Sequence, residues 1–278
     1  MKLLTIHANL AIKGVLSFLA CVAIPFVWDR PLMADPTKTQ ANWPVGQSSG
    51  RKHKPSSLVV NNLHGAQGKV VLEVLPGQQK DLEELGGETR PAKVCIAGLG
   101  SKSCYIAQAR RINFARDAQA YTVDLGEGHS AVLFQGRYVG LNDEWELVAI
   151  LGLGSRGQLN NLLPIVVISM QDHFRVWRDS KISDGELITA AQYVWTSKPP
   201  KETHFSSHHY QVSTYEFCPS SGRYLLVDQF LTRKKFPGLD GENHPGERVL
   251  SAMLPQVQSR LLEDRGSRKN ACRKLDEK

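Results

Sequence analysis

Short stretches in which apolar residues alternate with other residues recur along the chain from about Ser57 onward. In one of them Val70, Leu72 and Val74 occupy every second position, which is the pattern of a half-buried strand. Residues that favour turns, chiefly Gly, Pro, Asn and Ser, separate the stretches. We predict strands near 57–63, 69–75, 92–97, 103–109, 118–125, 130–136, 144–152, 164–170, 173–178, 187–196, 207–217 and 223–232.

This pattern predicts an all-β fold, a sandwich or barrel-like, of about ten to twelve short and mostly antiparallel strands. We expect the β-rich domain to span 57–240. At 241–266 the period changes: apolar residues recur at every fourth position from Val249 to Leu261, which predicts a C-terminal α-helix. Pro255 lies inside this run, and we expect it to kink or divide the helix because proline lacks the backbone N–H that an interior position donates.

Residues 1–34 have the pattern of a secretory signal peptide. No acidic residue precedes the uncharged run Val15–Val27, which is too short to span a bilayer. We expect cleavage before Asp35 and an exported mature chain, periplasmic or secreted, without a transmembrane segment. An uncleaved amphipathic anchor and a lipoprotein cleaved before Cys21 are the alternatives.

The charge balance is mildly basic, with a formal net charge of +7. Part of the excess lies in the signal peptide and part in the tail 267–278, which we expect to be disordered. Residues 35–56 are polar and rich in turn formers, and they are expected to form a flexible leader. No predicted element interleaves Arg or Lys with aromatic residues, so we expect no nucleic-acid partner. The balance is compatible with an envelope or anionic-glycan surface.

Four cysteines follow the predicted cleavage site, an even number that favours disulfides in an oxidising compartment. Cys95 and Cys104 flank a glycine-containing turn. A two-residue loop at 99–100 would place them directly opposite each other in a hairpin, at a distance that a disulfide can close. Cys218 and Cys272 are then left as a second pair, whose bonding stays open.

Two motifs are spelled like functional sites but lack the surroundings that such sites need. Gly152–Gly157 has the G-x-G-x-x-G spacing, yet only six residues separate it from Pro164, too few for the crossover helix of a dinucleotide-binding unit. Gly128–Val132 partly matches a nucleophile elbow, but a predicted strand follows it instead of a helix. We interpret the glycine motif as a connection between strands and expect no cofactor.

Three histidines, His204, His208 and His209, lie close together in the sequence. On a helix the first two would share a face and could chelate zinc, but on a strand they lie about 13 Å apart, too far to share one metal ion. We therefore expect no metal site here. With Trp195, these histidines form a candidate binding surface at the rim of a sheet.

Carboxylates in or next to strands are candidates for glycoside hydrolysis, which requires two carboxyl groups at a defined separation. They are Asp184, Glu186, Glu216 and Asp228. The expected function is a non-catalytic binding or envelope-associated module whose ligand is a protein or a glycan. The alternative is a secreted hydrolase that acts on glycan or peptide.

Ser221–Tyr224, three residues after Cys218, resembles the Ser-Gly-x-x-Tyr loop of small periplasmic lysozyme inhibitors. The resemblance covers one short loop of a much longer chain. Ser-Gly before a strand is also a common turn, so our expectation of function does not rest on this loop.

Overall fold

The computed structural model describes residues 55–78, 90–99, 103–109, 111–140, 144–164, 167–169, 171–196, 202–238, 245–266 and 272. These residues form mostly antiparallel β-sheets and one C-terminal helix, α1 (Pro245–Glu263), so the predicted fold class is confirmed. The predicted signal peptide, and the predicted leader and tail apart from Pro55, Ser56 and Cys272, lie outside the described residues. The strands are β1 (Ser56–Asn61), β2 (Lys69–Leu75), β3 (Lys93–Ile96), β4 (Tyr105–Ile106), β5 (Gln108–Ala109), β6 (Ile112–Asn113), β7 (Arg116–Gly126), β8 (His129–Val139), β9 (Glu144–Leu153), β10 (Leu159–Asn161), β11 (Val167–Ser169), β12 (His173–Trp177), β13 (Leu187–Val194), β14 (His209–Cys218) and β15 (Arg223–Leu231).

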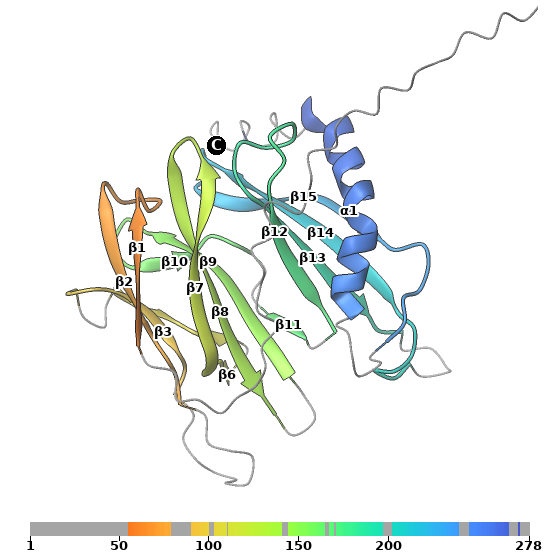
Figure 1. Ribbon diagram of the computed structural model, residues 1–278, viewed down its shortest axis with the longest axis horizontal. Coiled ribbons are helices and arrows are strands. Elements are labelled where there is room, and N and C mark those ends of the chain that lie inside the picture. Colours follow the sequence, from red (N-terminus) through yellow and green to blue (C-terminus); the bar gives the residue numbers. More distant parts are fainter. Residues whose placement is uncertain are drawn as a thin grey trace, which may run out of the picture. The chain divides into compact units, whose positions relative to one another are not determined.

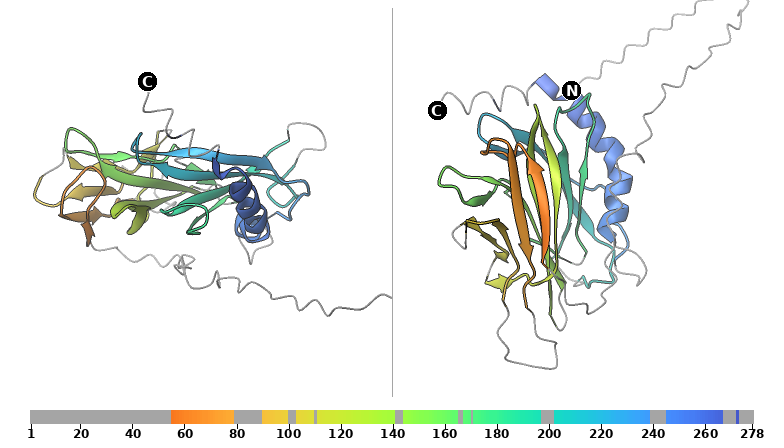
Figure 2. Two further views of the ribbon diagram at one scale, coloured as in Figure 1. Left: turned by 90° about the horizontal axis from the view of Figure 1, so that it is seen from above. Right: turned by 60° about the vertical axis from the view of Figure 1, so that its left-hand side comes forward.

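Three of the four sheets in the described part of the chain, and helix α1, are stacked as successive layers, as Figure 1 and Figure 2 show, and the fourth is the two-stranded pair β5-β6. The first sheet has the strand order β1-β2-β3-β4, and the third has the order β12-β13-β14-β15. The second sheet lies between them, with the order β10-β9-β8-β7 and with β11 paired to β9. An apolar core fills each of the three spaces: first to second sheet, second to third sheet, and third sheet to α1.

The second sheet is buried on both faces. In β8, Val132 and Phe134 belong to the core shared with the first sheet, whereas Ala131 and Leu133 belong to the core shared with the third. The neighbouring run Leu147–Leu151 of β9 is divided between the same two cores in the same alternating way. Burial on both faces explains why this part of the sequence is almost continuously apolar.

A disulfide joins Cys95 to Cys104 in the first sheet. Strands β3 and β4 pair with Val94 opposite Tyr105, and the same register places Cys95 opposite Cys104, as the hairpin argument predicts.

The turn of this hairpin starts earlier than the sequence predicts. The backbone N–H of Leu99 donates to the carbonyl oxygen of Ile96 at 3.3 Å. Gly98 occupies the left-handed region there, with a φ of 80°. The expected loop at 99–100 lies partly outside the described residues.

The glycine motif Gly152–Gly157 connects β9 to β10 as a hairpin. The N–H of Gly157 donates to the carbonyl oxygen of Gly154 at 2.9 Å, and the N–H of Gly154 donates to that of Gln158 at 2.8 Å. The motif is therefore a connection between antiparallel strands, the interpretation that the sequence favours over a dinucleotide site.

Helix α1 continues through Pro255, so the proline does not divide it. Val249 and Leu250 before the proline, and Val257 and Leu261 after it, are all buried against the third sheet. Because both halves are held by packing, the loss of one backbone hydrogen bond does not divide the helix. Over its length α1 is not apolar enough to cross a membrane.

Two contacts fix the C-terminal end of α1 to the third sheet. The guanidinium of Arg260 donates to both carboxylate oxygens of Asp228 on β15, at 2.6 to 3.1 Å, and lies 4.9 Å from the ring centre of Phe230. Beyond the helix, a disulfide joins Cys272 to Cys218 at the end of β14. The second pair of cysteines, left open by the sequence, is therefore bonded.

We predict that the Cys218–Cys272 disulfide stabilises the fold more than Cys95–Cys104 does. The first closes a loop of 54 residues and the second a loop of 9. Loop-closure entropy then gives losses of about 4 and about 3 kcal/mol, respectively, in the free energy of unfolding when each pair is replaced by serine. Urea unfolding of the two double variants measures the loss in free energy of unfolding for each disulfide. A larger loss for the Cys95 and Cys104 double variant would contradict the prediction.

Candidate functional site

Four rings gather where β13 ends and β14 begins. Tyr193 is near the end of β13, Trp195 follows the strand, and His204 and His208 lie in the segment that leads into β14. The ring centres of Trp195 lie 5.2 Å from His204, 5.5 Å from His208 and 5.4 Å from Tyr193. We call these four residues the aromatic–histidine cluster.

The cluster has a buried side and an exposed side. His208 is fully buried, whereas Trp195 keeps 46% of its surface exposed. Phe205, next to His204 in sequence, is 78% exposed. The indole N–H of Trp195 donates to the hydroxyl of Tyr193 at 2.5 Å, which fixes the orientation of the exposed ring.

Hydrogen bonds fix the buried side of the cluster in place. The imidazole of His208 contacts the carbonyl oxygen of Thr203 at 2.8 Å and a carboxylate oxygen of Glu202 at 3.3 Å. Glu202 also accepts from the ammonium of Lys235 at 2.7 Å and from the backbone N–H of Thr196 at 3.0 Å. The hydrogen bonds from Lys235 and Thr196 lower the pKa of Glu202 to about 2, so this carboxylate is ionised at neutral pH.

Two residues of the connection between β11 and β12 also make hydrogen bonds to the cluster. The side-chain amide of Gln171, which is fully buried, donates to the carbonyl oxygen of His204 at 2.8 Å. The carboxylate of Asp172 accepts from the backbone N–H of Tyr193 at 2.8 Å and from that of Ser169 at 2.9 Å. Burial raises the pKa of Asp172 to about 6, and the backbone hydrogen bonds partly oppose this shift.

Three of the four predicted binding residues, Trp195, His204 and His208, thus come together. His209 lies outside the cluster, since its ring contacts the carbonyl oxygen of Thr232 at 2.8 Å. Consecutive residues of a strand point to opposite faces, which separates it from His208. Among the described residues, no group of three or more His, Cys, Asp or Glu side chains is placed to hold a metal ion.

Several of the candidate carboxylates have structural contacts. Asp228 is paired with Arg260 of α1. Glu186 accepts from the backbone N–H of Asp124 at 2.8 Å. The carbonyl oxygen of Asp184 accepts from Arg178 at 2.8 Å, and the carboxylate of Asp124 pairs with the same guanidinium at 2.6 Å. The contacts of Glu186 and Arg178 with Asp124 join the β12–β13 connection to β7.

Sequence reasoning did not single out Glu146, a buried carboxyl group whose pKa is strongly raised. It lies on β9 opposite Arg137 of β8, and the side-chain amide of Gln135 donates to it. Arg137 is bound by Glu144 and Asp117 instead. Burial raises the pKa of Glu146 to about 7, opposed by the hydrogen bond from Gln135 and the charge of Arg137. An acidic residue inside an otherwise apolar strand is the signal that could have identified it.

Comparisons of the chain with protein-family models, with curated proteins and with solved structures found no match.

Glu146 predicts a specific dependence of stability on pH. Because its pKa is raised in the folded state, its contribution to stability is fully present below its unfolded pKa of about 4.3 and is lost as the pH rises through about 7. Glu146→Gln removes this dependence. Relative to wild type, we expect the variant to gain up to about 3 kcal/mol in free energy of unfolding between about pH 4.5 and about pH 8.

Chemical unfolding of both proteins across this pH range measures the difference, with Glu73→Gln on an exposed position of β2 as the matched control. A constant difference between wild type and Glu146→Gln would refute the assignment. Asp172 contributes a dependence of the same sign at lower pH in both proteins, so it cancels.

Proposed function

We propose that this chain is an exported, non-catalytic binding module that recognises an anionic glycan of the envelope or the extracellular space through the aromatic–histidine cluster. The two disulfides favour an oxidising environment outside the cytoplasm. The signal-peptide pattern of residues 1–34 supports the same location.

One observation carries the proposal: a half-exposed tryptophan is held in a single orientation. Tyr193, His204 and His208 contact its ring in T-shaped arrangements, and His208 is itself fixed by a buried hydrogen bond. A side chain ordered before binding loses little conformational entropy when the ligand arrives. Covering the exposed part of the Trp195 ring, roughly 100 Å², would contribute about 2.5 kcal/mol.

The surroundings of the ring favour an acidic sugar. The weakly positive C–H groups on one face of a sugar ring are attracted to the negative face of an indole. Arg233, Lys234 and Lys235 are all exposed on the segment that follows β15. Lys235 reaches the cluster through Glu202, and Phe236 of the same segment pairs with His208. Because Lys235 is paired with Glu202, Arg233 and Lys234 of this segment supply the charge that an acidic glycan needs.

We predict that Trp195→Ala weakens binding of a uronic-acid oligosaccharide by roughly tenfold or more, as expected for a central aromatic contact. The ring stands outside the apolar cores, so the variant should fold. Leu226→Ala, which removes a similarly exposed apolar side chain from β15, is the matched control and should bind as wild type does.

Isothermal titration calorimetry with uronic-acid oligomers and with neutral glucose oligomers tests whether the chain prefers an acidic glycan. Equal binding of the two oligomers, or unchanged affinity of Trp195→Ala, would overturn the glycan proposal. Binding of an envelope protein through Trp195 without any glycan binding would replace the glycan with a protein ligand.

A further inference from the structure

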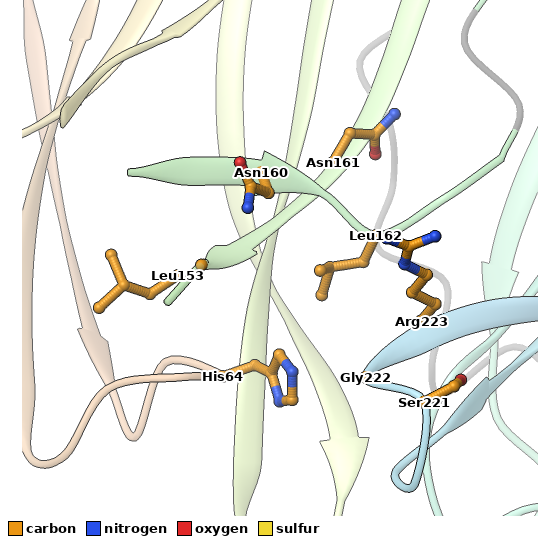
Figure 3. Close-up of a pocket in the computed structure, with 9 residues that line it drawn as sticks. His64, Leu153, Asn160, Asn161, Leu162, Ser221, Gly222 and Arg223 are labelled. Atoms are coloured by element: carbon orange, nitrogen blue, oxygen red, sulfur yellow. The ribbon is translucent and has the colours of Figure 1, made fainter. Parts of the chain in front are cut away.

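A cavity lies at the other end of β14 from the aromatic–histidine cluster, where three connections meet. They are the turn after β1, the β9–β10 hairpin and the β14–β15 hairpin. Its volume is about 420 Å³, which is within the range of small-molecule sites. Figure 3 shows His64, Asn160 and Leu162 pointing toward the same space, with Arg223 extending alongside Leu162.

Two glycines allow the backbone to pack closely against the residues that line this cavity. At Gly222 the φ is 62°, and a Cβ atom there would lie 3.0 Å from Nε2 of His64. A Cβ atom at Gly152 would lie 2.9 Å from a methyl carbon of Leu162 and 3.2 Å from the His64 ring. The first glycine of the G-x-G-x-x-G motif therefore lets the β9–β10 hairpin approach His64, a role unrelated to dinucleotides.

The charges around the cavity have one sign. Among the described residues that line it, none is acidic and Arg223 carries a permanent positive charge. Burial, followed by the neighbouring His129, lowers the pKa of His64, so this imidazole is uncharged near neutral pH and can donate or accept a hydrogen bond. The side-chain amide of Asn160 adds a further donor and acceptor, and Leu153 and Leu162 supply the smaller apolar part of a mostly polar lining.

We propose that this cavity binds a small organic anion of about the size of a sugar acid, with its carboxylate on Arg223 and its polar groups on His64 and Asn160. A planar guanidinium matches a carboxylate with two parallel hydrogen bonds. The small apolar part of the lining, from Leu153 and Leu162, can contact the carbon skeleton of the ligand. This site is independent of the proposed function, because the cavity and the cluster lie at opposite ends of β14 and share no residue.

The test is an NMR titration of the full mature chain with D-glucuronate and with D-glucuronamide, which replaces the carboxylate by a neutral amide of the same shape. We expect saturable shifts in the amides around Asn160 and Gly222 with glucuronate. The amide should bind about tenfold more weakly or worse, the loss expected when a charge-assisted hydrogen-bonded pair is removed.

Arg223→Ala should weaken glucuronate binding by about tenfold as well. Arg156→Ala is the matched control, because Arg156 is an exposed arginine of the β9–β10 hairpin that does not line the cavity. Trp195→Ala should also leave glucuronate binding at the cavity unchanged, which separates this site from the aromatic–histidine cluster.

Equal affinity for the acid and the amide, an unchanged affinity of Arg223→Ala, or the absence of shifts at the cavity would each overturn the proposal. The comparison of acid with amide uses wild-type protein, so it remains decisive even where a variant folds poorly.

Discussion

Burial of the second sheet on both faces is the constraint on which the other layers depend. Its alternating side chains supply one wall of the core shared with the first sheet and one wall of the core shared with the third. Phe134 and Leu133, adjacent in β8, belong to different cores. Among the described residues, the core of the first sheet and the inner core of the third sheet each include side chains of the second sheet. The turn after β1 and the β14–β15 hairpin nevertheless come close to each other, since a Cβ atom at Gly222 would lie 3.0 Å from Nε2 of His64.

Much of this architecture is visible in the sequence, because strand periodicity is a local property. The predicted strands correspond to most of those observed, and the β9–β10 connection was identified from its glycines. Strands β6 (Ile112–Asn113) and β10 (Leu159–Asn161) are too short to produce a periodic signal. The sequence left open whether Pro255 kinks or divides the helix, and α1 stays undivided because packing on the third sheet holds both halves.

The candidate site was predictable only in part. Trp195 and His208 were singled out by residue type, but the parts that hold them in place were not. Glu202 joins Thr196 to Lys235, and Gln171 reaches His204 from a different connection. Such contacts depend on how loops from separate strands come together in the fold. The spacing of residues along the sequence does not reveal this arrangement. The strands within each sheet mostly pair with their neighbours in sequence, but the stack of sheets follows from face-to-face packing between distant segments. The sequence therefore indicated a sandwich or a barrel without choosing the layers.

Native-state hydrogen exchange tests most directly whether the middle sheet unites the layers. The account predicts that the slowest amides lie in β8 and β9, and that the protected amides of β2 and β13 exchange no more slowly than these. All of them would then become exposed in the same global unfolding event. Protected amides in the third sheet and α1 that persist after β8 and β9 have exchanged would contradict the account, because that half would then fold without the middle sheet.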